Sequence, residues 1–254
     1  MQRSEPALPW LEPGDDFPHV TQAWGPDTPA PGLLAAGGAL DVATLKRAYA
    51  AGIFPWFGPN EPILWWSTEP RMVLQTRHFK LHPSLRKTLQ QFRQNAQCEI
   101  RIDSAFSQVI HACSTSQRAG QSGTWIVPDM VRAYQALHES GCAHSVETWV
   151  QGELVGGLYC VSMGKAVFGE SMFAKTTDAS KIALTALVGF CRAHGIAMID
   201  CQQNTRHLAS LGAAQMSRVD FLQQVEQGLA QAAPLWKFKP QYWTELMPKA
   251  APTA

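Results

Sequence analysis

The 254-residue chain lacks the short patterns that mark metal-binding, redox and membrane proteins. Its six cysteines show no CxxC or CxxH spacing, which argues against a zinc site or a redox pair. No apolar run reaches the roughly 20 residues of a membrane span. The N-terminus also lacks the apolar core of a signal peptide. We therefore expect a cytoplasmic protein that binds no metal and does not enter a membrane.

Charge is scarce too, at 16% of residues, whereas 46% are hydrophobic. A chain of this length and composition can bury a sizeable core, in one large domain or two unequal ones. The formal net charge of +1 hides a basic stretch between Ser67 and Arg101. Its acidic residues are Glu69 and Glu99, whereas its basic residues are Arg71, Arg77, Lys80, Arg86, Lys87, Arg93 and Arg101. Such an excess fits either contact with phosphates or an ordinary solvated helix face.

The first part of the chain is interrupted by proline and glycine. A helix is expected between Asp41, which can cap its N-terminus, and Gly52. Between Gly52 and Ser67, tryptophan and phenylalanine alternate with glycine and proline in a pattern too broken for a regular helix. These rings could stack on a nucleobase or form a small aromatic core. We predict a small N-terminal domain over residues 1–77.

From residue 78 onward the pattern predicts alternating helices and strands. An amphipathic helix follows Pro83, and its polar face is basic. Strands at 144–150, 153–162 and 165–169, joined by short glycine-containing turns, predict an antiparallel meander. A long helix then leads into a strand that ends at Asp200. We predict one α/β (α+β) domain over 78–254, with a disordered tail from about residue 247.

Three polar residues stand where apolar runs end. Asp200 and Gln202 follow one predicted strand and Glu170 ends another. In an extended chain Asp200 and Gln202 face the same side, and Cys201 faces the other. The pair could act on one ligand, or be a loop cap and a solvent residue. For Glu170 the alternative to a functional role is a structural ion pair.

Antiparallel strands, then a helix, then a strand that returns to the meander is the element order of acyl-transfer domains of the GNAT superfamily. A coenzyme A enzyme of that class would cradle pyrophosphate in a Q/R-x-x-G-x-G/A turn that opens a helix. The nearest match, Gln117 to Ser122, ends in serine and is followed by Thr-Trp-Ile rather than a helix. We expect no coenzyme A site and no other cofactor.

Nine segments between about Gly32 and Arg218 form a pattern in a fixed order. They are Gly52–Phe57, Ile63–Ser67, Gly123–Ile126, His144–Glu147, Leu154–Gly157, Gly169–Phe173, Ala179–Lys181, Ile199–Gln202 and Ala209–Gly212. Together they resemble the bacterial leucyl/phenylalanyl-tRNA-protein transferases. The resemblance implies a GNAT-like acyltransferase domain, with a mostly antiparallel sheet flanked by helices, after a small N-terminal domain. It also implies transfer of Leu, Phe or Met from aminoacyl-tRNA to proteins with N-terminal Arg or Lys, which marks them for degradation by the N-end rule.

The resemblance also implies roles for the three polar residues. Asp200 would orient Gln202, whose carbonyl accepts a hydrogen bond from the attacking amine. Glu170 would attract the cationic N-terminal residue or position its amine. A neutral amide is a very poor base, so we expect Gln202 to align the amine while a carboxylate, water or the substrate takes the proton.

Substrate-binding positions follow from the same resemblance. Trp56 and Trp125 would stack on the terminal adenosine of the tRNA. The acceptor-stem phosphates would contact Arg77, Lys80, Arg86, Lys87 and Arg93. The pocket for the transferred amino acid would be Leu158, Val167, Met172, Leu184 and Cys191. At positions 158, 167 and 191 the family has Met, Phe and Phe, so we expect a roomier pocket here.

Two other classes stay open from the sequence. One is a tRNA-dependent aminoacyltransferase that acts on a non-protein amine, such as a peptidoglycan precursor. The other is a non-catalytic tRNA-binding module, which would keep the basic helix without needing Asp200, Glu170 and Gln202 together. For the transferase we expect a monomer.

Overall fold

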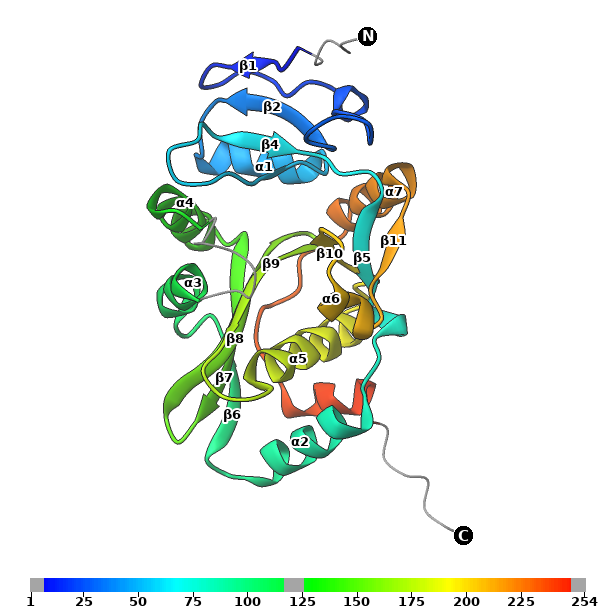
Figure 1. Cartoon of the computed structure of the whole chain (residues 1–254). Helices are drawn as coiled ribbons and strands as arrows, with labels where there is room; N and C mark the ends of the chain where they lie inside the picture. Colours follow the sequence, from blue (N-terminus) through cyan, green and yellow to red (C-terminus); the bar gives the residue numbers. More distant parts are fainter. Residues whose placement is uncertain (1–6, 117–125, 248–254) are drawn as a thin grey trace.

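The computed structural model of the chain describes residues 7–116 and 126–247. These residues form two sheets, the first of four strands in the order β1-β2-β4-β3 and the second of seven in the order β11-β5-β10-β9-β8-β7-β6. Figure 1 shows the small N-terminal layer above the larger sheet and its helices. The mixed α/β class and the small N-terminal region are as the sequence predicts.

The N-terminal layer packs one helix against short strands. Its elements are β1 (Trp10–Leu11), η1 (Val20–Gln22), β2 (Leu33–Gly37), α1 (Val42–Ala50), β3 (Phe54–Pro55) and β4 (Leu64–Trp66). Asp41 caps α1 as predicted, because its Oδ1 accepts the N–H of Thr44 at 2.9 Å. Trp65 is fully buried and its indole donates to the carbonyl of Gly37. Most of the rings between Gly52 and Ser67 are therefore core, and Trp56 is the one that stays partly exposed.

The large sheet is antiparallel except between two strands. Its strands are β5 (Arg71–Gln75), β6 (Cys98–Ile102), β7 (Ala143–Val150), β8 (Glu153–Met163), β9 (Ala166–Ala174), β10 (Met198–Gln202) and β11 (Ala214–Met216). Only β9 and β10 pair in parallel. Gln151 and Gly152 both have positive φ in the turn between β7 and β8, as a tight two-residue hairpin requires. The predicted meander is confirmed, except that its third strand runs past Gly169 to Ala174, so Glu170 lies within the strand and not at its end.

Strand β5 belongs to the large sheet, where it lies between β10 and β11. Its residues Met72, Val73 and Leu74 are buried, as in a central strand. The change from the first sheet to the second thus falls between Trp66 and Arg71, ahead of the predicted domain boundary at residue 77.

Helices cover both faces of the large sheet. They are η2 (Thr76–His78), α2 (Pro83–Gln94), α3 (Phe106–Thr115), α4 (Pro128–Glu139), α5 (Ala179–Ala193), α6 (Arg206–Ser210), α7 (Arg218–Leu229) and η3 (Pro240–Glu245). Two core clusters result, one with α3, α4 and α7, the other around α5. Among the described residues no helix is long and apolar enough to cross a membrane.

The C-terminal segment packs against α5 through η3. Tyr242 and Trp243 are buried there. Met247, where we expect the disordered tail to begin, is also buried, at 9% exposure. The rest of that predicted tail lies outside the described residues.

Two neighbouring strands carry a β-bulge at the predicted site residues. In β9 the register against β8 passes from Tyr159–Ser171 to Cys160–Gly169, so Glu170 is the extra residue. In β10 the register against β5 passes from Asp200 directly to Gln202, which leaves Cys201 extra. Bulges of this kind re-aim side chains beside active sites. The strict alternation that we expect from an extended chain is therefore broken at Cys201.

Candidate active site

A cavity of about 530 Å³ lies where the bulged parts of β9 and β10 meet α5, α6 and the N-terminal layer. Its lining includes the predicted site residues Glu170, Asp200 and Gln202. It also includes Trp56 from the N-terminal layer, which rests edge-on against Trp66 with ring centres 5.3 Å apart. Residues far apart in the sequence thus meet around one opening.

One part of this cavity is apolar. Of the predicted amino-acid pocket, Leu158, Met172 and Leu184 line it. Val167 and Cys191 are buried in the adjoining core and do not line it, whereas Leu187 and Ile199 do. The predicted stacking residue Trp125 lies outside the described residues.

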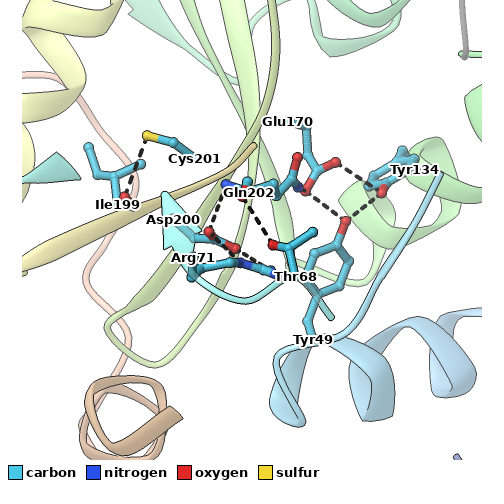
Figure 2. Close-up of polar contacts among 9 residues, drawn as sticks. All are labelled: Tyr49, Thr68, Arg71, Tyr134, Glu170, Ile199, Asp200, Cys201 and Gln202. Atoms are coloured by element: carbon cyan, nitrogen blue, oxygen red, sulfur yellow. Dashed lines mark hydrogen bonds and ion pairs between the residues drawn. The ribbon is translucent and has the colours of Figure 1, made fainter. Parts of the chain in front are cut away.

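Glu170 accepts hydrogen bonds from three side chains. Tyr49 on α1 donates to its Oε1 at 2.7 Å, and Tyr134 on α4 donates to its Oε2 at 3.2 Å. The two tyrosine hydroxyls also lie within hydrogen-bonding distance of each other. The Nε2 of Gln202 donates to Oε1 of Glu170 at 2.8 Å. Figure 2 shows Glu170 between the tyrosine pair and Gln202.

Burial sets the proton affinity of this carboxyl group. It raises the pKa of Glu170 from 4.5 to about 7, and the nearby charge of Asp200 acts in the same direction. The hydrogen bonds from Tyr49 and Tyr134 oppose that rise. Burial, followed by the charge of Glu170, raises the pKa of both tyrosines well above the usual value, so both stay protonated donors at neutral pH.

Asp200 is fully buried and paired with a buried arginine. The Nε of Arg71 donates to its Oδ1 at 2.9 Å and the Nη2 donates to its Oδ2 at 2.7 Å. The same Oδ1 accepts the backbone N–H of Gln202 at 2.8 Å. Asp200 therefore contacts Gln202 through the main chain, while the side-chain amide of Gln202 bonds to Glu170.

This arrangement leaves two groups for substrate chemistry. Among the described residues, Glu170 contacts hydroxyl and amide groups, whereas Asp200 is already committed to Arg71. A carboxyl group with a pKa near 7 can take a proton from a bound amine at neutral pH. Because the Nε2 of Gln202 is engaged, its carbonyl oxygen is the end that can accept a hydrogen bond from that amine.

Three residues of the site are missing from our sequence predictions. Helical periodicity marks Tyr49 and Tyr134 as core positions and gives no sign that their hydroxyls reach Glu170. We counted Arg71 among the surface cations, yet it is 0% exposed. The missed signals are chemical: a buried tyrosine needs a partner for its hydroxyl, and an arginine that opens an apolar strand needs a carboxylate.

The predicted phosphate-binding residues Arg77, Lys80, Arg86, Lys87 and Arg93 are all exposed. Three of them lie on α2, which contacts α5. Arg77 instead lines a second cavity, of about 520 Å³, between the far ends of β5, β9 and β10 and helix α7. Among the residues that the structure describes, no cluster of three or more His, Cys, Asp or Glu side chains could hold a metal ion.

Comparison with known proteins gives nearly full-length matches. The family model of the leucyl/phenylalanyl-tRNA protein transferases matches residues 73–226, and that of its N-terminal domain matches residues 38–69. A leucyl/phenylalanyl-tRNA--protein transferase of Albidiferax ferrireducens is 63% identical, with 97% of each chain covered. One from Polaromonas is also 63% identical, over 97% of this chain and 96% of the relative. One from Leptothrix cholodnii is 56% identical, over 94% and 95%.

Proposed function

The chain belongs to the leucyl/phenylalanyl-tRNA protein transferase family, and from this premise we propose that it moves Leu, Phe or Met from charged tRNA to a protein N-terminus. The acceptor residue is an N-terminal Arg or Lys, and the product is marked for degradation. The reaction takes place in the cytoplasm, where charged tRNA is available, and the enzyme acts as a monomer without a cofactor.

The observation that carries the proposal is the placement of Glu170 and Gln202 beside an apolar pocket. The pocket walls Leu158, Met172 and Leu184 can hold an unbranched, γ-branched or aromatic side chain. The polar groups stand where the ester carbonyl and the incoming amine would meet. A cationic N-terminal residue also finds in Glu170 a carboxylate that is not already paired with a basic side chain among the described residues.

The reaction requires little covalent help from the protein. An aminoacyl ester is already activated, so the amine attacks its carbonyl directly once the two are aligned. The new C–N bond forms as the C–O bond to the ribose breaks. The amine loses a proton and the ribose oxygen gains one. Gln202 aligns the amine through its carbonyl, and Glu170 takes the proton and can return it to the leaving oxygen.

The terminal adenosine of the tRNA stacks on Trp56 at the edge of the cavity. Trp125 is proposed as the second ring. The pocket beyond accepts the transferred side chain, and its walls are Leu187 and Ile199 together with the predicted residues Leu158, Met172 and Leu184. The shape of this wall sets the preference of the enzyme among Leu, Phe and Met.

A transfer assay tests the proposal directly. Incubation with charged tRNA and a peptide that begins with Arg should yield a peptide extended by Leu, Phe or Met. Gln202→Ala should lower the rate by about 100-fold, because the amine is no longer aligned, while tRNA binding persists. A peptide beginning with Ala is the matched control. Extension of both peptides, or of a small amine instead, would assign a different acceptor.

Binding of tRNA should depend steeply on salt. If Arg86, Lys87 and Arg93 on α2 contact phosphates, replacing all three by Ala should weaken binding uniformly across tRNA species. The slope of log affinity against log salt should fall by about one for each contact removed. Filter binding at several salt concentrations measures it, with exposed Lys237→Ala as the control. An unchanged slope would remove α2 from the tRNA interface.

A further inference from the structure

We propose that Arg71 is a positioning residue for the transfer reaction, which holds Gln202 in its active conformation by fixing Asp200. Arg71 does not line the cavity and so does not touch substrate. The inference rests on the proposed function, since it concerns how the amide that aligns the amine is held.

Arg71 is held in a single orientation by its surroundings. It is 0% exposed, in a strand between β10 and β11. Its Cζ lies 4.6 Å from the ring centre of Phe54 in β3 and 4.6 Å from that of Phe221 in α7. These rings favour a planar cation and restrict its rotation. The guanidinium therefore presents its Nε and Nη2 edge to Asp200.

That edge meets Asp200 in a two-point contact, with bonds of 2.9 and 2.7 Å. The remaining nitrogen, Nη1, has no hydrogen-bond partner among the described residues. Asp200 is thus the one carboxylate that anchors the guanidinium in the described part of the chain. A bidentate pair of this kind fixes the carboxylate plane as well as its position.

The fixed carboxylate in turn supports an unusual backbone conformation. Gln202 has φ of +58°, in the left-handed region that residues other than glycine rarely adopt. Oδ1 of Asp200 accepts its N–H at 2.8 Å, just after the bulge at Cys201. The hydroxyl of Thr68 donates to its carbonyl at 3.3 Å. The backbone bond to Asp200 is the shorter of these two contacts, and it depends on where Arg71 holds the carboxylate.

Loss of the guanidinium should release this turn. Asp200 would keep its burial but lose the two-point contact with Arg71, and would rotate toward other donors. The amide of Gln202 would then move relative to Glu170 and the amine. A displacement of about 1 Å at a reacting centre is enough to lower a rate by about 100-fold.

The first experiment measures kcat and KM for an Arg-peptide with the Arg71→Ala protein. We expect kcat to fall by about 100-fold, with KM for the peptide and the affinity for tRNA nearly unchanged. Added methylguanidinium, at concentrations that leave the wild type folded and active, should restore much of kcat by occupying the space between the two rings. Arg71→Lys keeps the charge without the two-point contact, so it should be intermediate. If the Arg71→Ala protein does not fold, the Arg71→Lys protein provides the test instead.

The matched control is Arg218→Ala. Arg218 also joins α7 to the segment between the sheets, by donating to the carbonyl of Ser67 at 2.9 Å and pairing with Glu69, but it does not contact Asp200. If Arg71 only tied these parts together, the two substitutions should lower activity alike. We expect Arg218→Ala to keep kcat.

A double-substitution cycle isolates the route through Gln202. In a Gln202→Ala background, Arg71→Ala should cost less than about threefold further activity, because the group it positions is already absent. A full additional loss of about 100-fold, wild-type kcat in Arg71→Ala, or an equal loss in Arg218→Ala would overturn the inference. Absence of transfer by the wild-type protein would instead refute the proposed function.

Discussion

Glu170→Gln should lower kcat/KM for an Arg-peptide by about 10²–10⁴-fold, the usual loss when a general base is removed. The substitution keeps the shape of the side chain and an oxygen that can accept from Tyr49 or Tyr134. It removes the ability to take a proton from the amine. Steady-state transfer measured with saturating charged tRNA gives the comparison.

The pH dependence of the wild type should report the same group. Because the pKa of Glu170 is about 7 and the active form is the ionised one, the rate should rise with pH through about 7. The α-amino group of the acceptor, with a pKa of about 8, adds a second rising limb. The limb near 7 should vanish in Glu170→Gln, leaving only that of the amine. A variant with the wild-type rate and both limbs would contradict the role.

The loss in this variant should not reflect unfolding. The pKa of Glu170 is about 7 when folded and 4.5 at its ordinary value, so the folded state holds the proton more tightly. The stability that this proton contributes is present below pH 4.5 and is lost as pH rises toward 7. Glutamine undergoes no such loss. Above pH 7 the thermal midpoint of Glu170→Gln should therefore match or exceed that of the wild type.

Asp200→Ala should lower the free energy of unfolding by about 3–5 kcal/mol, the cost of leaving one member of a buried ion pair alone. The remaining guanidinium of Arg71 would stay between two aromatic rings with no carboxylate beside it. Denaturant unfolding followed by circular dichroism measures the change. The same protein should also lose transfer activity, since the turn at Gln202 loses its acceptor.

A matched variant separates the unpaired charge from the loss of Asp200 itself. Replacing both members, by Arg71→Met and Asp200→Leu, removes the buried charges together and should recover most of the stability without recovering activity. If the Asp200→Ala protein is as stable as the wild type, the ion pair between Arg71 and Asp200 does not contribute to the free energy of unfolding. The turn at Gln202 would then have to be held by other contacts.

Local pattern predicted the elements well and the chemistry in part. The cap at Asp41, the basic helix after Pro83 and the meander each depend on a few neighbouring residues, and each is found. Asp178 precedes the long helix α5 and is of a residue type that favours the N-cap, but it has φ of +63° and its side chain bonds to Lys181 instead of capping the helix. Turn geometry of that kind is not readable from periodicity.

The sequence pattern does not predict the contacts between elements that are far apart in the chain. Arg71 and Asp200 are 129 residues apart and Tyr49 and Glu170 are 121 apart, so no local period links them. The bulges that make Glu170 and Cys201 the extra residues arise from pairing between strands and leave no local mark. Those strand pairings determine the geometry of the site. A family resemblance identifies the site residues but does not give this geometry.

Tyr49 links the active site to the N-terminal layer. Its hydroxyl reaches Glu170 from α1, and the same N-terminal layer carries Trp56 at the cavity edge. The platform proposed for the donor's adenosine and one of the hydrogen-bond donors to the base therefore belong to the same N-terminal layer. If that layer tilts as tRNA docks, the hydrogen bond to the base changes in the same motion. Docking of the donor and the proton affinity of the base would then be coupled through Tyr49.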